Sequence, residues 1–115
     1  VAHSLSMLNL HVLTSGPIPP NPAEILNSMR TRNMWSDLKE RYDYVFIDSP
    51  PILSVTDGAI IASQTDASAL VVHAGKTRKE VAAQAKDRLQ QANARIIGVV
   101  LNQTKPNDQD YYYYY

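Results

Sequence analysis

The sequence has no cysteine, and its formal net charge is zero, with 11 basic and 11 acidic side chains among 115 residues. The lack of cysteine excludes disulfides, thiolate chemistry and cysteine-ligated zinc. The balanced charge argues against the basic surface of a nucleic-acid-binding domain. No apolar run approaches the length of a membrane-spanning helix, and the first residues do not have the pattern of a signal peptide. We therefore expect one soluble domain at most.

Glycine is also scarce. The chain has four glycines, and they are scattered singly at Gly16, Gly58, Gly75 and Gly98. A loop that cradles nucleotide phosphates needs clustered glycines followed by Lys and Ser or Thr, because its backbone N–H groups must approach the phosphates closely. The sequence as given contains no such loop.

The most informative stretch that is present runs from Asp43 to Pro51, with the sequence DYVFIDSPP. Four apolar residues, followed by Asp48 and a pair of prolines, predict a strand that is buried on both faces and ends at the carboxylate. In open parallel α/β sheets, ligands bind beyond the carboxyl ends of the strands, where a carboxylate can hold a hydrated Mg²⁺ beside nucleotide phosphates. This is the pattern of a Walker B strand. A buried strand whose final Asp caps the next turn is the structural alternative.

The part of the chain before this stretch predicts a strand and a helix. The strand covers Leu8–Leu13 with His11 facing solvent, and a Gly-Pro turn closes it. The helix runs from Pro22 to about Arg41, with Asn21 as its cap and Glu24 reaching back. Its expected apolar stripe consists of Ile25, Leu26, Met29, Met34, Trp35 and Leu38. Its basic residues are expected either in solvent or against a partner subunit, and they are Arg30, Arg32, Lys39 and Arg41.

The part after Pro51 predicts a short helix through Gln64, capped by Thr56 and Asp57. Asp57 is interpreted as a cap residue or as a second carboxylate near the crevice of Asp48. A second buried strand is expected at Ser68–His73, and a last one at Arg95–Leu101, ending on Asn102. A capping box starts the helix between them, with a core stripe of Val81, Ala85, Leu89 and Ala92.

The alternation of strands and helices predicts an α/β domain over residues 1–102. We expect right-handed crossovers and a parallel sheet of about four strands, with helices on both faces. Residues 103–115 form a second region. Its first part is polar and aperiodic, so we expect a flexible tail. The tail ends in Tyr111, Tyr112, Tyr113, Tyr114 and Tyr115.

Five terminal tyrosines are either a low-complexity or adhesive end, or a set of phosphate acceptors. Phosphorylation of all five would add a charge of about −8 to −10. Fully extended, the chain from Lys105 to Tyr115 reaches about 35 to 40 Å, enough to enter the crevice of a neighbouring subunit.

Taken together, these segments resemble the bacterial tyrosine kinases, the P-loop proteins that regulate capsular and exopolysaccharide synthesis and export. The residues that carry the resemblance are the Walker-B-like stretch 45–51, Val55–Asp57, the segments 72–77 and 98–102, the segment 16–24 and the tyrosine cluster. Their order and spacing, together with the tyrosine tail, distinguish the chain from the related partition and cell-division ATPases.

The resemblance implies roles for individual residues. It implies that Asp48 is a catalytic residue that helps to hold the Mg²⁺ of ATP through water, that Asp57 is a supporting acid at the cofactor site, and that Asn102 hydrogen-bonds the adenine. It makes Tyr111–Tyr115 sites of autophosphorylation in trans, within a homo-oligomeric ring. It also implies a membrane-spanning chain-length regulator, fused or separate, as activator, and a cytoplasmic location at the inner face of the plasma membrane.

The chain departs from the family pattern in two ways. It has no P-loop with its Lys, and it lacks the second Walker-type strand whose Asp acts on the tyrosine hydroxyl in the family. We therefore expect the C-terminal part of a P-loop NTPase-like kinase domain, inactive in isolation but phosphorylatable on its tail. A start at Val1 without Met favours this reading over that of a degenerate relative. Two alternatives remain open, a non-catalytic interaction or decoy module phosphorylated by another kinase, and a relative of the partition ATPases.

Overall fold

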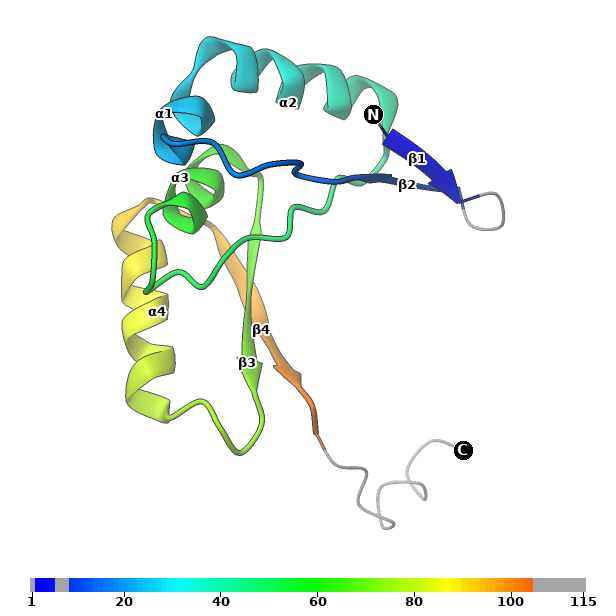
Figure 1. The fold of residues 1–115 in the computed structure, drawn as a ribbon. Helices are drawn as coiled ribbons and strands as arrows, with labels where there is room; N and C mark the ends of the chain where they lie inside the picture. Colours follow the sequence, from blue (N-terminus) through cyan, green and yellow to red (C-terminus); the bar gives the residue numbers. More distant parts are fainter. Residues whose placement is uncertain (1, 6–8, 105–115) are drawn as a thin grey trace, which may run out of the picture.

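A computed structural model describes residues 2–5 and 9–104 of the chain (Figure 1). The helices and strands follow in the order β1 (Ala2–Leu5), β2 (Leu10–Leu13), α1 (Pro22–Asn27), α2 (Met29–Arg41), α3 (Asp57–Gln64), β3 (Ser68–His73), α4 (Lys79–Gln91) and β4 (Ile96–Asn102). The second half, from α3 to β4, confirms the α/β class with a parallel strand pair.

The described strands form two separate sheets of two strands each. β3 and β4 are parallel and pair from Ser68 and Ile96 to His73 and Asn102, joined by the crossover helix α4. β2 pairs antiparallel with β1. The predicted parallel sheet of about four strands is therefore wrong in strand number for the described residues. A strand over Leu8–Leu13 was predicted, and β2 covers Leu10–Leu13. Its hairpin partner β1 was not predicted, since the short segment before it gave no strand pattern.

The stretch that was predicted to be the central strand is not a strand. Residues 44–50 have no helix or strand assignment. The side chains of Phe46 and Tyr44 are 93% and 82% exposed, so the predicted burial on both faces is also wrong. A β-strand is stabilised by hydrogen bonds and side-chain pairs with its neighbours, and no described strand pairs with this segment. The local sequence favours extended backbone, but pairing has to come from another segment.

The helix predicted from Pro22 to Arg41 is divided at Ser28. This residue has extended backbone, and its hydroxyl oxygen accepts a hydrogen bond from the backbone N–H of Thr31 at 3.2 Å. The hydroxyl of Thr31 in turn donates to the carbonyl of Ile25 at 2.6 Å, and Thr31 is buried. Ser28 is thus the N-cap of a second helix. Asn21 makes no side-chain cap bond; its amide donates to Glu24 Oε2 instead.

The core of the described region is small. Its buried apolar side chains are Ala62 on α3 and Ala85 and Leu89 on α4, each about 5% exposed. The predicted stripe of α4 is confirmed, because Val81 and Ala92 are partly buried beside these two residues. In Figure 1, α4 lies along one side of the β3–β4 pair.

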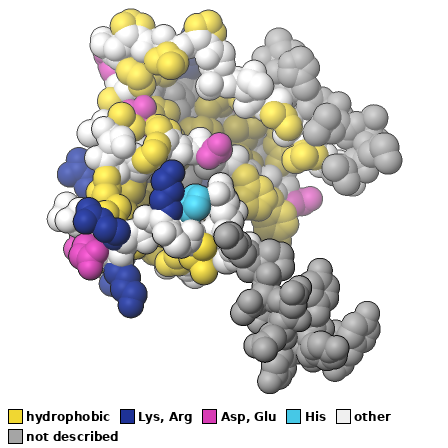
Figure 2. Space-filling model, turned by 60° about the horizontal axis from the view of Figure 1, so that its bottom comes forward, with side chains coloured by type: hydrophobic (Ala, Val, Ile, Leu, Met, Phe, Trp, Pro, Cys, Tyr) yellow, Lys and Arg dark blue, Asp and Glu magenta, His cyan; other side chains and the backbone are white. Residues whose placement is uncertain are grey.

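Large apolar side chains are exposed elsewhere, and Figure 2 shows them as patches on the surface next to Lys and Arg. Successive residues of a strand point to opposite faces. Val99 and Val100 of β4 are 63% and 50% exposed, so helices do not cover both faces of this strand as predicted. In the described residues, no helix is long and apolar enough to cross a membrane.

Candidate functional site

Asp48 lies in the irregular segment that precedes α3, and its side chain is exposed. The expectation that it sits at the tip of a strand is wrong for the described residues, because residues 44–50 do not form one. The next residues, however, are held in place. Ser49 and Pro50 lie against Gly58 in the first turn of α3. The carboxylate of Asp48 therefore directly precedes a fixed contact between the loop and the helix.

The space beside Gly58 would admit a methyl group in van der Waals contact with the loop, but it leaves little room for a larger side chain. A Cβ atom at this position would lie 3.3 Å from Ile52 Cδ1 and 3.4 Å from both Pro50 O and Ser49 Oγ. The backbone of Gly58 is buried. The loop after Asp48 therefore lies close to the first turn of α3, where Asp57 precedes Gly58.

We expect Gly58→Val to destabilise the chain by about 1–3 kcal/mol, because the branched side chain would overlap the loop at residues 49–52. Gly98→Val is the matched control, since a Cβ there meets no atom within 4 Å and valine favours strands. Urea unfolding followed by circular dichroism measures both. Equal effects of the two substitutions would contradict the close approach.

Asp57 is the first residue of α3, which ends at Gln64 as predicted. Its carboxylate is partly exposed and stands at the positive end of the helix dipole. Thr56 occupies the cap position but makes no side-chain cap bond. The structure thus places Asp57 and Asp48 on either side of the contact between Gly58 and Ser49, one on the helix and one on the loop.

The carboxyl ends of β3 and β4 form a second edge, built around His73 and Asn102. These two residues are register partners, and the backbone N–H of Ala74 donates to the carbonyl of Asn102 at 2.9 Å. The turn that follows uses Gly75 at φ 70°, a conformation that favours glycine. Thr77 Oγ1 accepts from the backbone N–H of His73 at 3.0 Å, so Thr77 fixes this turn. The predicted capping box is replaced, because the N-cap of α4 is Arg78.

One end of the Asn102 side-chain amide is already hydrogen-bonded within the chain. Its Oδ1 accepts a hydrogen bond from the backbone N–H of Gln103 at 2.8 Å, and Gln103 has a positive φ of 56°. In the described part of the chain, the Nδ2 group makes no hydrogen bond. An amide that is oriented in this way at the end of a strand has two N–H donors to offer a ring nitrogen or carbonyl of a ligand.

The acidic groups of the described residues do not form a complete metal site. No group of three His, Asp or Glu side chains lies close enough to hold an ion there. Mg²⁺ is commonly bound by only one or two carboxylates, with the remaining ligands from water and substrate phosphates. Asp48 and Asp57 are carboxylates of the kind that such a site uses, and their role in holding the ion stays a prediction from the sequence. When bound, such an ion would neutralise phosphate charge.

Other sequence predictions can also be located. Arg30, Arg32, Lys39 and Arg41 are all exposed, and His11 is exposed on β2 with its ring 5.3 Å from that of Tyr42. The predicted tail and the phosphate acceptors Tyr111–Tyr115 lie outside the described residues. Of the predicted apolar stripe, Ile25, Met29 and Met34 are exposed by more than a third.

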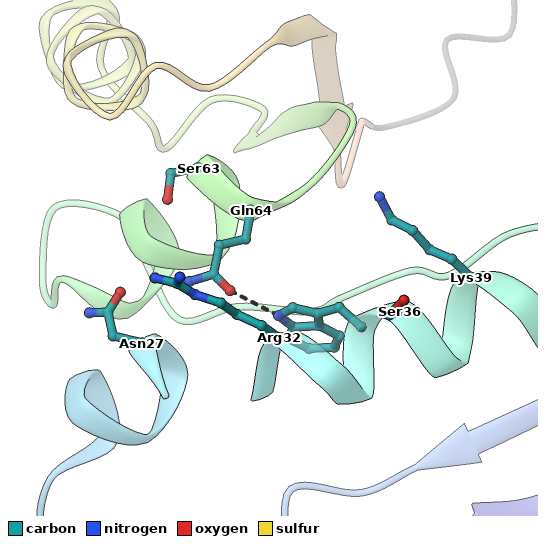
Figure 3. A pocket seen from close by; sticks show the side chains of 7 residues that line it. Asn27, Arg32, Ser36, Lys39, Ser63 and Gln64 are labelled. Carbon is teal, nitrogen blue, oxygen red and sulfur yellow. Dashed lines mark hydrogen bonds between the residues drawn. The ribbon is translucent and has the colours of Figure 1, made fainter. Parts of the chain in front are cut away.

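A groove between α2 and α3 was not anticipated. It has a volume of about 550 Å³, and its lining includes Arg32, Trp35, Lys39 and Gln64 (Figure 3). Sequence periodicity placed Trp35 in an apolar stripe, and Gln64 carried no signal, because its partners lie 29 and 38 residues away. The signal that was available is the spacing of Arg32, Trp35, Ser36 and Lys39, which puts them on one face of a helix.

The chain matches a set of bacterial kinases in sequence. It is 44% identical over 107 residues to the tyrosine-protein kinase YwqD of Bacillus subtilis, and 39% identical over 107 residues to the putative tyrosine-protein kinase CapB of Staphylococcus aureus. The chain is homologous to part of the bacterial tyrosine-protein kinases. These alignments cover 93% of this chain but only 45% and 47% of the relatives, so the chain spans less than half of their length.

Solved structures give the same result. The chimerical protein CapA2B2 superposes with a TM-score of 0.86 at 35% identity, over 91% of this chain and 46% of that chain. The kinase domain of VpsO superposes with a TM-score of 0.84 at 35% identity, over 90% of this chain and 51% of that chain. No protein-family model matches the chain. The resemblance inferred from the motifs to bacterial tyrosine kinases is thereby confirmed.

Proposed function

We propose that this chain is the metal-binding and acceptor part of an ATP-dependent protein-tyrosine autokinase. The observation that carries the proposal is the match of 93% of the chain to 45% of the tyrosine-protein kinase YwqD and 47% of the putative tyrosine-protein kinase CapB. In the intact enzyme Asp48 helps to hold the Mg²⁺ of ATP, Asp57 supports it, and Asn102 donates to the adenine. Tyr111–Tyr115 accept phosphate.

In this proposal, two parts of the kinase contribute to one site. The chain supplies carboxylates for the metal and an amide for the base, but its sequence contains no glycine-rich loop to surround the phosphates. Phosphoryl transfer depends on positioning and on neutralising charge, so most of the rate is lost without that loop. By itself the chain is an acceptor rather than a catalyst.

We expect the isolated chain with MgATP to incorporate no phosphate. Addition of an intact homologous kinase is expected to phosphorylate its tail, because the tyrosines are the acceptor hydroxyls. Phosphotyrosine is measured by mass spectrometry. A chain in which all five terminal tyrosines are replaced by phenylalanine is the control, and it should lose this signal entirely.

Two outcomes would contradict the proposal. Phosphorylation of the isolated chain by itself would show that it is a complete catalyst. If an active homologue never modified the tail, the acceptor role would be wrong.

A third observation separates the decoy module from the kinase part. A decoy stays inactive when it is combined with the phosphate-binding half of a homologue, whereas the kinase part restores ATP-dependent phosphorylation.

The proposal extends to the biological setting. We place the parent kinase in the regulation of capsule or exopolysaccharide synthesis and export, in a ring of subunits at the inner face of the plasma membrane. Its activator there is a membrane-spanning chain-length regulator, either fused or separate. Arg41, which is exposed in the last turn of α2, is a candidate for the contact between subunits.

A further inference from the structure

In the groove between α2 and α3, the polar side-chain groups of Trp35 and Gln64 are already hydrogen-bonded within the chain. Trp35 Nε1 donates to Gln64 Oε1 at 3.0 Å, and Gln64 Nε2 donates to the backbone carbonyl of Leu26 at 3.1 Å. The amide of Gln64 therefore uses both of its ends and connects three helices. This network fixes the position of the indole, so the groove has a defined aromatic surface.

The walls of the groove carry hydrogen-bond donors with unused capacity. In the described part of the chain, the side chains of Arg32 and Ser36 make no hydrogen bond or ion pair. Lys39 makes one contact, to Asp66 Oδ1 at 2.9 Å, which leaves two ammonium N–H groups. Asp66 itself is 83% exposed and does not line the groove. The groove thus presents two cations and the hydroxyls of Ser36 and Ser63, of which Ser63 already donates to the carbonyl of Ile60, but no carboxylate.

These groups lie on one face of α2, because Arg32, Trp35, Ser36 and Lys39 are spaced by three and four residues. Figure 3 shows the side chain of Arg32 extending toward Gln64 and Asn27. A guanidinium binds phosphate through two parallel hydrogen bonds, and an indole packs against flat aromatic rings. A ligand that joins an aromatic ring to a phosphate matches both features.

We propose that this groove binds the tyrosine tail of this chain after it has been phosphorylated. The tail has the complementary chemistry, since Asp108, Asp110 and the phosphotyrosines are acidic, and each phosphotyrosine joins a ring to a phosphate. The inference rests on the proposed function for the source of the phosphate. None of the residues assigned to ATP and Mg²⁺ lines the groove. The groove would therefore bind the phosphorylated tail, which is the product of the kinase reaction.

The test uses Trp35, which is the single tryptophan of the chain and lies in the groove. The full chain is titrated with a synthetic peptide of residues 104–115, with its tyrosines phosphorylated or free, while tryptophan emission is recorded. We expect the phosphorylated peptide to change this emission saturably and the free peptide to bind at least about tenfold more weakly. Binding should weaken as salt is raised, because exposed charges are screened.

Two substitutions on one helix make the result specific. Arg32→Ala is expected to weaken binding of the phosphorylated peptide about tenfold, the loss typical of a charge-assisted contact. Arg30→Ala is the matched control, since Arg30 is exposed on the same helix but does not line the groove. Circular dichroism confirms that both variants are folded.

Several results would overturn the inference. They are an unchanged tryptophan emission at saturating peptide, equal effects of the two substitutions, or an ATP titration that reproduces the change produced by the peptide. The last result would make the groove a nucleotide site. Because the peptide is synthetic, the test needs no kinase activity. Failure to bind leaves the proposed function intact, and a tail that no kinase modifies leaves the binding result intact.

Discussion

Replacing Asp48 with asparagine is expected to lower kcat about 10²–10³-fold in a protein that joins this chain to the phosphate-binding half of a homologous kinase. Asparagine keeps the size and one acceptor oxygen of aspartate but loses the charge that attracts Mg²⁺. Asp48 is exposed in the structure, so the substitution should not disturb packing. Incorporation of labelled phosphate into tyrosine, measured at saturating ATP, reports the change.

Asp43→Asn is the matched control for this prediction. Asp43 is also exposed, and it lies five residues earlier between α2 and α3. We expect its replacement to leave kcat unchanged within about twofold, since surface substitutions away from a site have small effects. Equal losses from the two substitutions would mean that negative charge on this segment matters, and not a metal ligand at position 48.

The second large effect concerns stability, and it is expected at Leu89. This residue is the largest of the buried apolar side chains in the described region, at 5% exposure. Leu89→Ala should cost about 2–5 kcal/mol of unfolding free energy, from lost burial and the cavity that remains. The other buried apolar side chains of the described core are two alanines, so Leu89 supplies most of the buried apolar side-chain volume there. Small domains have little stability in reserve, so we expect a chain that is largely unfolded.

The same change on an exposed strand provides the comparison. Leu101 on β4 is 58% exposed, and Leu101→Ala is expected to cost no more than about 0.5 kcal/mol. Urea unfolding followed by far-UV circular dichroism measures both variants. If Leu101→Ala proved as costly as Leu89→Ala, then β4 would be packed in solution against something that the described residues do not include.

Some of the fold and of the site could be predicted because the signal is local. The bounds of β3 and α3, the core stripe at Ala85 and Leu89, and the position of Asn102 at the end of β4 follow from periodicity and strand-ending residues. The kinase resemblance came from the order of the motifs, and the matches with YwqD and CapB confirm it. The break at Ser28 had a local signal too, since serine is a frequent N-cap. The apolar stripe continues across this position, however, and therefore predicted one continuous helix.

The sequence by itself determined which segments favour helix or extended backbone, which carboxylates follow apolar runs, and which protein family the chain resembles. Only the tertiary structure decided that residues 44–50 remain unpaired, that Ser49 and Pro50 lie against Gly58 of α3, and that Gln64 joins Trp35 to Leu26. The physical reason is one of range. Backbone preference and side-chain periodicity act over a few residues, whereas strand pairing and close packing depend on partners that are distant in the chain.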